Sequence, residues 1–422
     1  MNIWLITIGE PIMHAKNKLR LHRTGILAKR ISDDTDHNVT WWTSGFNHFT
    51  KKNVFNEDTV LQVNEKLKII AINGGGYQSN VSLSRIRDHK VIAKKFKSLC
   101  TFESIPDIIV VSFPTLGLCQ AALEYGKNFN VPVLLDYRDM WPEEFLFVLP
   151  KTLRPLGRIV LTSLFLKTKN VFRMADGLIA ITQEFLNIGL NKSGRKMHSM
   201  DAVYPLGYLE KQYDKIDLVK ADDFWRSMGL SKDRIRICFF GTIGHQYDLE
   251  TVIKASKLPG GEKYQFIICG SGDNLLRLKS INGENPGVVF PGYMSAAQIK
   301  SLMDTCEYGL CPYVPKEAFL NSMPGKVFEY LSTGLPIIGT LGNGVLGKFL
   351  NEHKIGVSYT ANSPESLLEG LRSLAMMNNC IIGEKIIEIF NSQFSAEVVY
   401  SDYIRHLEAV VDRYKCLSQT KS

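Results

Sequence analysis

The chain has 422 residues, 45% hydrophobic and 22% charged, a balance typical of folded globular proteins and not of disordered or fibrous ones. This length allows two domains with full hydrophobic cores. No apolar run approaches the roughly 18–20 residues that cross a bilayer, which argues against a membrane-spanning protein. The eight cysteines are scattered without a C-x-x-C pair, which predicts reduced thiols in a cytosolic protein.

The net charge of +8 is concentrated in the first half of the chain. Residues 1–205 carry 27 Lys and Arg against 18 Asp and Glu, whereas the remainder carries 23 against 24. The first half is therefore expected to face something anionic. The sequence lacks zinc-ligand spacing, RNP-type aromatic motifs and a basic heptad helix, so we do not expect nucleic acid. A membrane surface is the better candidate.

The first half alternates apolar strands with helical segments. The first segment lacks a basic n-region and reaches Gly9-Glu10-Pro11 after a few apolar positions, so we predict a strand and not a signal peptide. The predicted strands are Asn2–Thr7, Val39–Thr43, Leu67–Ile72, Ile108–Phe113, Val131–Tyr137 and Gly177–Thr182. The predicted helices between them include Arg20–Ile31, Ser84–Ser98 and Leu118–Asn128.

The second half repeats the scheme, which predicts two α/β domains, each a doubly wound parallel sheet. Its predicted strands are Arg236–Phe240, Gln265–Cys269, Val288–Phe290, Tyr308–Pro312, Pro336–Thr340 and Gly356–Tyr359. Its predicted helices are Asp248–Ser256, Ser295–Asp304, Pro324–Thr333 and Pro364–Ala375.

We place the first domain at residues 1–205, the second at 206–395, and a C-terminal crossover helix and tail at 396–422. The join is expected near Tyr204–Asp233, which reads as irregular and highly charged. The last helix is expected to pack back on the first domain. Parallel sheets bind ligands beyond the carboxyl ends of their strands, so two such domains facing across a cleft would hold one substrate each.

Glycine-bearing turns follow three of the predicted strands. They contain Gly9, the pair Gly241 and Gly244, and Gly270. Small residues at such turns let a phosphate approach the backbone and the dipole of the following helix. The alternative is a plain connection between strand and helix. The Gly270 turn lacks the third glycine of a dinucleotide fingerprint, so it is weak evidence for a nicotinamide cofactor.

The stretch NSMPGKVFEYLSTGLPII, residues 321–338, predicts a short helix that starts near Pro324 and ends before Gly334. Lys326 and Glu329 stand three apart and so share one face near the helix start. Lys326 can meet a diphosphate there, and Glu329 can accept hydrogen bonds from the vicinal hydroxyls of a ribose. The alternative is a surface ion pair, which the apolar flanking residues disfavour.

This stretch resembles the donor-site segment of nucleotide-sugar-dependent glycosyltransferases of family 4, which have the GT-B fold. FFGTIGHQYDLETVIKA, ICGSGDNLLRLKS and VVFPGYMSAAQIKSLM match further blocks of that domain in order, and TIGEP, HRTGILAKRI and LLDYRDMWPEEF look like a bacterial surface-polysaccharide branch. The resemblance implies that Glu329 binds the nucleotide ribose and that the glycines approach the diphosphate. It also implies retention of anomeric configuration. Many members carry a second Glu where this chain has Asn321.

Catalytic candidates follow the strand of LLDYRDMWPEEF. Asp139 could orient or deprotonate an acceptor hydroxyl, with Arg138 beside it and Lys326 on the leaving diphosphate. The alternative is that Arg138 and Asp139 brace the turn through an ion pair. His14 and His245 follow two of the glycine turns and could meet sugar or phosphate, although a lone histidine is more often structural.

We expect no metal and no cofactor beyond the nucleotide-sugar substrate. Asp34-Thr35-Asp36 resembles a D-x-D metal motif only superficially, because it ends a helix without a further carboxylate ligand nearby. Elsewhere no cluster has magnesium or zinc spacing. Lys326, backbone amides and a helix N-terminus would then balance the charge of the leaving diphosphate.

The segment 145–175 indicates a membrane surface. It contains six Lys and Arg, no Asp or Glu, and many Leu, Phe and Val, which suits a helix lying in the interface of an anionic leaflet. The Lys16–Arg23 run could extend this basic surface. The alternative is an ordinary domain helix with a solvated basic face. The predicted location is cytoplasmic, peripheral on the inner face of the plasma membrane.

Together these features predict a glycosyltransferase that moves a sugar from a nucleoside-diphosphate donor to a lipid-linked saccharide in O-antigen, capsule or exopolysaccharide synthesis. One alternative is a nucleotide-sugar 2-epimerase of the same architecture, which would consume donor without acceptor. Another is a non-catalytic nucleotide-sugar-binding partner of a second transferase.

Overall fold

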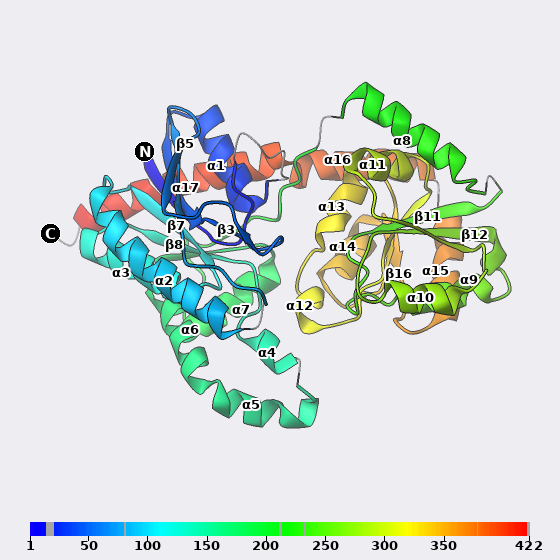
Figure 1. Cartoon of the computed structure of the whole chain (residues 1–422), viewed down its shortest axis with the longest axis horizontal. Coiled ribbons are helices and arrows are strands. Elements are labelled where there is room, and N and C mark those ends of the chain that lie inside the picture. Colours follow the sequence, from blue (N-terminus) through cyan, green and yellow to red (C-terminus); the bar gives the residue numbers. More distant parts are fainter. Residues whose placement is uncertain are drawn as a thin grey trace. The chain divides into compact units, whose positions relative to one another are not determined.

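The chain forms two compact α/β units (Figure 1). The computed structural model describes residues 1–13, 21–79, 82–147, 149–210, 213–231, 233–377 and 379–419. Unit 1 comprises Met1–Gly207 and Val399–Ser422, and unit 2 comprises Tyr208–Val398. Each unit is built around one main sheet, and the predicted class of two doubly wound, Rossmann-like domains is confirmed.

The sheet of unit 1 has eight strands in the order β10-β9-β8-β7-β1-β2-β6-β5. They are β1 Asn2–Ile6, β2 Asn38–Ser44, β5 Thr59–Gln62, β6 Leu67–Ile72, β7 Ile108–Phe113, β8 Val133–Tyr137, β9 Gly177–Ala180 and β10 Ala202–Val203. A small antiparallel pair, β3 Phe46–Asn47 and β4 Lys52–Asn53, lies outside this sheet. The strand order reverses at β1, which pairs with β2 on one side and β7 on the other.

One edge of this sheet departs from the parallel pattern that the sequence predicts. Strand β5 runs antiparallel to β6. Only residues 63–66 connect the two strands, and a connection this short can join antiparallel neighbours but cannot make a parallel crossover. The other strand pairs of the main sheet are parallel.

Helices cover this sheet, and a tryptophan-rich core lies beneath α2. The helices of unit 1 are α1 Arg23–Asp34, α2 Leu83–Leu99, α3 Leu116–Phe129, α4 Glu143–Phe147, α5 Arg154–Val160, α6 Thr162–Met174 and α7 Gln183–Ser193, with short 3₁₀ turns at Cys100–Phe102 and Lys151–Leu153. The rings of Trp4 and Trp42 meet at 5.2 Å, and Phe96 of α2 packs 5.0 Å from Trp42. These buried aromatic rings fix the position of the central strands.

The segment 145–175 is not the single helix that the sequence predicts. It contains the end of α4, the 3₁₀ turn Lys151–Leu153, and helices α5 and α6. Pro155 is the second residue of α5, and Leu161 interrupts the helix with φ −89° and ψ 8° before α6 begins. Proline fits a first helical turn but not a helix interior, which explains a new start near Pro155.

The sheet of unit 2 has six parallel strands in the order β13-β12-β11-β14-β15-β16. They are β11 Ile235–Phe240, β12 Tyr264–Cys269, β13 Val288–Gly292, β14 Tyr308–Cys311, β15 Ile337–Gly339 and β16 Gly356–Ser358. The helices are α8 Lys215–Ser227, α9 Leu249–Lys257, α10 Leu275–Asn282, α11 Ala296–Asp304, α12 Glu317–Leu320, α13 Gly325–Ser332, α14 Val345–His353, α15 Pro364–Ala375 and α16 Asn379–Gln393, with a 3₁₀ turn at Gly261–Lys263. Here the strand order reverses at β11, between β12 and β14.

The join that was expected to be irregular contains helix α8. The Asp214 side chain caps this helix by accepting a hydrogen bond from the Ile216 N–H at 2.9 Å. Ala221 and Trp225, four residues apart, form its buried face, and the Trp225 indole donates to the Gln298 carbonyl of α11. The charged residues of α8 occupy the opposite, exposed face, so a high local charge concealed a regular helix.

The last helix, α17 Ala396–Gln419, belongs to unit 1 from Val399 onward. Its Tyr403 ring stacks on Tyr204 at 4.7 Å, and Glu408 accepts a hydrogen bond from His37 at 2.7 Å. Tyr400, Leu407, Val410 and Val411 are buried on the same helix. The expected packing of the C-terminal helix on the first domain is therefore confirmed.

Candidate functional site

The Lys326 ammonium lies buried at the carboxyl edge of the unit 2 sheet. Its Nζ donates hydrogen bonds to the hydroxyls of Tyr247 at 2.9 Å and Tyr313 at 3.3 Å. It also lies over three aromatic rings, 4.0 Å from the centroid of Tyr247, 4.3 Å from Phe239 and 4.8 Å from Tyr313. Burial lowers the pKa of Lys326, and the neighbouring Tyr247, Cys311 and Glu329 counteract this shift.

This ammonium is well placed to bind an anion. Among the described residues its hydrogen bonds go to two neutral hydroxyls, whereas an ammonium has three N–H donors. Tyr247 comes from the loop after β11, and Tyr313 follows β14, so Lys326 sits where the strand order reverses. Open parallel sheets bind their ligands at this point.

Helix α13 carries Lys326 into this position and is itself anchored by Tyr330. The buried Tyr330 hydroxyl donates to the carbonyls of Cys238 on β11 at 3.0 Å and Leu310 on β14 at 3.1 Å. Gly309 lets the ring approach, because a Cβ there would lie 2.6 Å from it. Pro324 is the N-cap of the helix and not its first residue as predicted. The helix register is thus fixed by a phenol that spans two strands.

Glu329 lies one turn after Lys326 on the same helix. Its side chain is half-buried, and its charge acts to raise the pKa of Lys326. The carboxylate and the ammonium are therefore close enough to interact electrostatically, on the face that the sequence predicts. Lys326 is buried and Glu329 is half-buried.

The turn after β11 places the Gly241 backbone close to the Lys326 ammonium. A Cβ on Gly241, whose φ is +141°, would lie 3.8 Å from the Lys326 Nζ and 3.9 Å from the Tyr247 hydroxyl oxygen. The exposed backbone of Gly241 and Thr242 therefore borders the same space as Lys326. Gly244 lies further along the turn, where its N–H donates to the Thr242 carbonyl at 3.0 Å.

Gly270, in the connection after β12, packs against the backbone of this turn. Its φ is +140°, and a Cβ there would lie 1.8 Å from the Gly241 carbonyl oxygen. Hydrogen bonds join the two turns, from the Ile243 N–H to the Ser271 carbonyl at 2.8 Å and from the Gly241 N–H to the Cys269 carbonyl at 3.1 Å. The structure thus places Gly270 against protein backbone, where it sets the position of Gly241.

In unit 1, Arg138 lies at the centre of a buried polar network. Its guanidinium donates to the carboxylates of Glu10 and Asp136 and, at 2.8 Å each, to the hydroxyls of Thr24 and Ser112. Burial acts against the charge, but the two carboxylates raise the pKa of Arg138 above its ordinary value. The network joins the ends of β1, β7 and β8 to the start of α1. In this structure Arg138 braces the strand ends.

A second arginine connects this network to the chain near residue 204. Arg23 donates to Asp136 at 3.1 Å and to the carbonyls of Tyr204 and Pro205 at 2.8 and 2.7 Å. Burial acts to raise the pKa of Asp136, but Arg138 and Arg23 outweigh it and hold this pKa below its usual range. Sequence reasoning missed Arg23 and Glu10 because their ionic partners, Asp136 and Arg138, lie more than a hundred residues away.

Asp139 follows this network and is exposed at the surface. Neighbouring protein nevertheless displaces water from its carboxyl, which raises its pKa, while Arg138 and Arg85 act in the opposite direction. Gly9 follows β1 with φ +90°, and a Cβ there would lie 4.0 Å from the His48 Cβ. These two candidates lie with Arg138 at the carboxyl edge of the unit 1 sheet.

The remaining candidates are peripheral to both clusters. His245 is exposed, with its Nε2 3.9 Å from the Asp273 carboxylate. Asn321 ends α12, and its side-chain amide donates to the Glu317 carbonyl at 2.9 Å. Asp36 is solvent-exposed and pairs with Lys66, as expected of a turn. His14 and most of the Lys16–Arg23 run lie outside the described residues.

Among the described residues, no group of three or more His, Cys, Asp and Glu is arranged to hold a metal ion. Within the described part of the chain, the thiols that form no disulfide include Cys100, Cys119, Cys238, Cys269, Cys306 and Cys311. In the same part of the chain, the helices all lack the length and apolar composition needed to span a membrane.

Residues 222–381 match the family model "Glycosyl transferases group 1". This segment contains Lys326, Glu329 and the glycine turns after β11 and β12. A search of curated proteins found no match to the sequence.

Solved structures resemble the whole chain at low sequence identity. HepE from Anabaena in complex with UDP is 12% identical, with a TM-score of 0.64, over 97% of this chain and 99% of that one. A glycosyltransferase from Rickettsia africae is 13% identical, with a TM-score of 0.62, over 97% and 98%. α,α-Trehalose 6-phosphate synthase from Burkholderia multivorans is 11% identical, with a TM-score of 0.65, over 100% and 98%. These likenesses establish the GT-B fold.

The contact between Gly270 and Gly241 predicts a large effect of a single methyl group. Gly270→Ala forces a Cβ onto a backbone oxygen in a strained region of φ, so we expect the free energy of unfolding of unit 2 to fall by about 3 kcal/mol or more. Urea unfolding would measure it. Gly229→Ala, just after α8 in the same unit, is the matched control, because its φ is +64° and the added methyl meets open space, for a loss of about 1 kcal/mol. Equal losses would contradict the tight joining of the two turns.

Proposed function

We propose that this chain is a metal-independent, retaining glycosyltransferase of family 4 that moves a sugar from a nucleoside-diphosphate sugar to a lipid-linked saccharide in bacterial surface-polysaccharide synthesis. The observation that carries the proposal is the buried Lys326 ammonium beside the Gly241 backbone, with Glu329 one turn along α13. The match to group 1 glycosyl transferases over this segment and the UDP and UDP-glucose complexes of Anabaena HepE support it.

In the proposed donor site, Lys326 and backbone around Gly241 hold the diphosphate, and Glu329 accepts hydrogen bonds from the ribose hydroxyls. During transfer the bond between the anomeric carbon and the phosphate oxygen breaks, and a bond to the acceptor oxygen forms. Negative charge then grows on the leaving diphosphate. A fixed ammonium stabilises this charge more in the transition state than in the ground state, which is what lowers the barrier.

We assign the acceptor to unit 1. Asp139 is exposed, and its raised pKa suits a carboxylate that orients an acceptor hydroxyl or takes its proton. Arg138 holds the strand end from which Asp139 projects, through the bonds to Asp136 and Glu10. Gly9 has no side chain and therefore leaves room for the acceptor at the end of β1. The acceptor proton would pass either to Asp139 or to the leaving phosphate.

Replacing the ribose-binding carboxylate tests the donor site. Glu329→Gln keeps the shape of the side chain but removes its charge, so we expect kcat/KM for sugar transfer to fall about 100-fold with the fold intact. Transfer from labelled UDP-sugars to a polyprenyl-diphosphate-linked acceptor is the measurement. Glu352→Gln on the exposed face of α14 is the control and should retain full activity. Unchanged turnover in Glu329→Gln would reject the assignment, and donor consumption without acceptor would favour a 2-epimerase.

The proposed mechanism takes its positive charge from Lys326. We therefore expect transfer to persist in excess chelator, because no divalent cation is required to neutralise the diphosphate. Activity measured with EDTA and then with added magnesium checks this. Activity that disappears with EDTA and returns with magnesium alone would contradict metal independence.

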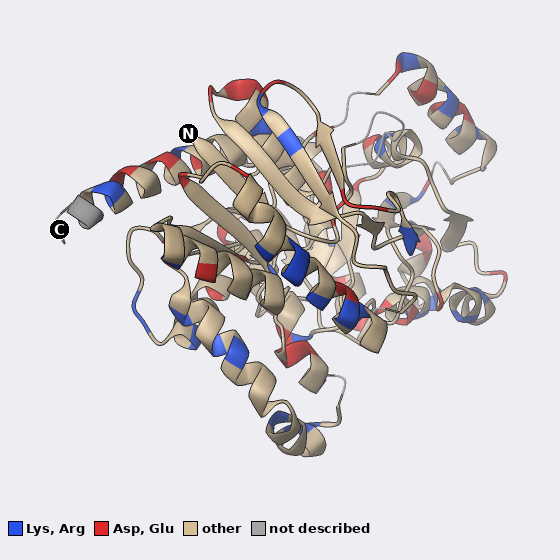
Figure 2. Ribbon diagram, turned by 60° about the vertical axis from the view of Figure 1, so that its left-hand side comes forward, with Lys and Arg blue, Asp and Glu red and all other residues tan. Residues whose placement is uncertain are grey.

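We also propose that α5 and α6 rest on an anionic membrane leaflet. Helix α5 has no buried residue, and Leu156, Ile159 and Val160 are 60–76% exposed. Residues 145–175 carry six basic side chains and no acidic one, and Figure 2 shows the charges along the ribbon. Exposed apolar side chains among basic ones match an interface-binding surface, where each basic residue contributes about 1 kcal/mol.

Neutralising the basic residues of this surface should release the protein from vesicles. Changing Lys151, Arg154, Arg158 and Lys167 to Gln is expected to weaken binding to anionic vesicles at least about 100-fold, from about 1 kcal/mol for each charge. Cosedimentation with phosphatidylglycerol-containing vesicles measures it.

The control makes the same change in net charge elsewhere on unit 1. Arg87, Lys90 and Lys94 of α2 and Lys127 of α3 are exposed and lie outside the α5–α6 surface. Their replacement by Gln should leave most of the binding intact. Equal losses in the two variants would show that net charge alone governs adsorption and would contradict a membrane role for α5 and α6.

A further inference from the structure

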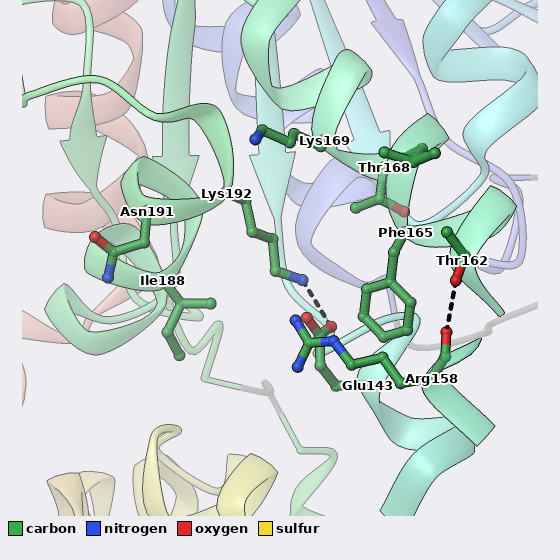
Figure 3. Close-up of a pocket in the computed structure, with 10 residues that line it drawn as sticks. Glu143, Arg158, Thr162, Phe165, Thr168, Lys169, Ile188, Asn191 and Lys192 are labelled. Atoms are coloured by element: carbon green, nitrogen blue, oxygen red, sulfur yellow. Dashed lines mark hydrogen bonds and ion pairs between the residues drawn. The ribbon is translucent and has the colours of Figure 1, made fainter. Parts of the chain in front are cut away.

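A pocket of about 440 Å³ lies between α4, α5, α6 and α7 of unit 1, and Arg138 is not among the residues that line it (Figure 3). This size is within the range of small-molecule sites. Phe165 and Leu166 of α6 and Ile188 of α7 supply apolar walls. Neither the donor site nor the proposed acceptor residues include these side chains.

The acidic group of the pocket is already neutralised. Lys192 of α7 pairs with the Glu143 carboxylate of α4 at 2.7 Å (Figure 3). The same ammonium also donates to the Trp141 carbonyl at 3.1 Å. The Lys192 ammonium lies over the rings of Tyr137 at 5.4 Å and Phe172 at 5.6 Å. This pair fixes α4 against α7 and leaves the other cations of the pocket to set its charge.

Those cations are Arg158 of α5 and Lys169 of α6, both exposed to solvent. The Arg158 guanidinium stacks 5.1 Å from the centroid of Phe165, which holds the charge directly beside an apolar wall. The pocket is therefore apolar inside and positive at its edge. Arg158 lines the pocket and also belongs to α5, so the pocket adjoins the helix that carries the exposed apolar residues.

A buried hydroxyl in the same pocket has no partner. Thr168 lines the pocket and is 2% exposed, and its Oγ1 makes no hydrogen bond to the described residues. Helical threonines commonly bond the carbonyl one turn back, as Thr162 does here with Arg158 at 3.1 Å. The Thr168 hydroxyl is therefore available to a polar group that enters this pocket.

We propose that this pocket binds one phosphate-headed lipid, with the phosphate held by Arg158 and Lys169 and the hydrocarbon chain against Phe165, Leu166 and Ile188. The Thr168 hydroxyl then donates to an oxygen of the head region. The proposal rests on the proposed membrane association only for the source of the lipid. The pocket would convert general adsorption of α5 and α6 into a stoichiometric contact with a single lipid molecule.

Titration with a monomeric lipid tests this site apart from membrane adsorption. Dioctanoyl phosphatidic acid, kept below its micelle-forming concentration, is titrated into the full chain by calorimetry. We expect saturable binding of one molecule, and at least tenfold weaker binding in the Arg158→Gln, Lys169→Gln double variant. The matched double variant Lys90→Gln, Lys94→Gln removes the same charge from exposed positions of α2, outside both the pocket and the α5–α6 surface, and should stay within threefold of the unmodified chain.

Two further variants address the interior of the pocket. Ile188→Trp fills the apolar part and should abolish lipid binding, while Thr168→Val removes the unpaired hydroxyl and should weaken binding without lowering the melting temperature. A melting temperature unchanged in Thr168→Val separates a binding effect from misfolding.

Several outcomes would overturn the proposal. They are the absence of saturable binding, equal losses in the two charge variants, or competition by inorganic phosphate at concentrations matching the lipid, which would indicate a site for free phosphate. Dioctanoylglycerol, which lacks the phosphate, should not compete. If the chain binds this lipid but transfers no sugar, only the proposed function is contradicted. If the chain transfers sugar but does not bind this lipid, only the pocket proposal is contradicted.

Discussion

The donor site proposed for unit 2 is centred on one buried ammonium. Moving a charged group out of water costs several kcal/mol, and the protein offsets part of this for Lys326 with three aromatic rings and two phenol hydroxyls. All of these partners are neutral, so burial still lowers the pKa of Lys326. A dianionic diphosphate would complete the compensation. The interaction thus gives the site a preference for anions before any ligand arrives.

The fold holds this charge in place through contacts that have no chemical role themselves. Tyr330 ties α13 to β11 and β14, and Gly270 sets the turn that brings Gly241 beside the ammonium. Unit 1 uses a different device at the equivalent strand ends, where Arg138 is surrounded by two carboxylates and two hydroxyls. One unit surrounds its cation with neutral groups, and the other uses its cation to join strands.

Much of this could be predicted from the sequence. Apolar strands alternating with helices identified both sheets, and the spacing of Lys326 and Glu329 placed them on one face of a short helix. Local patterns could not show Tyr247 or Tyr313, because their roles depend on contacts between distant elements. Helix α8 was missed because charged residues dominate it, although Asp214 and the buried pair Ala221 and Trp225 mark its start and its inner face. The break at Leu161 was missed because no proline or glycine occupies that position.

Thermal stabilisation by nucleoside diphosphates tests the central claim most directly. A ligand at 100 times its Kd stabilises the folded state by about 2.7 kcal/mol, which should raise the Tm by about 5–10 °C. The account predicts this rise for at least one nucleoside diphosphate, little effect of the corresponding nucleoside, and loss of the rise in Lys326→Gln with its unliganded melting intact. A chain that no nucleoside diphosphate stabilises, or a Lys326→Gln variant stabilised as strongly as the unmodified chain, would contradict it.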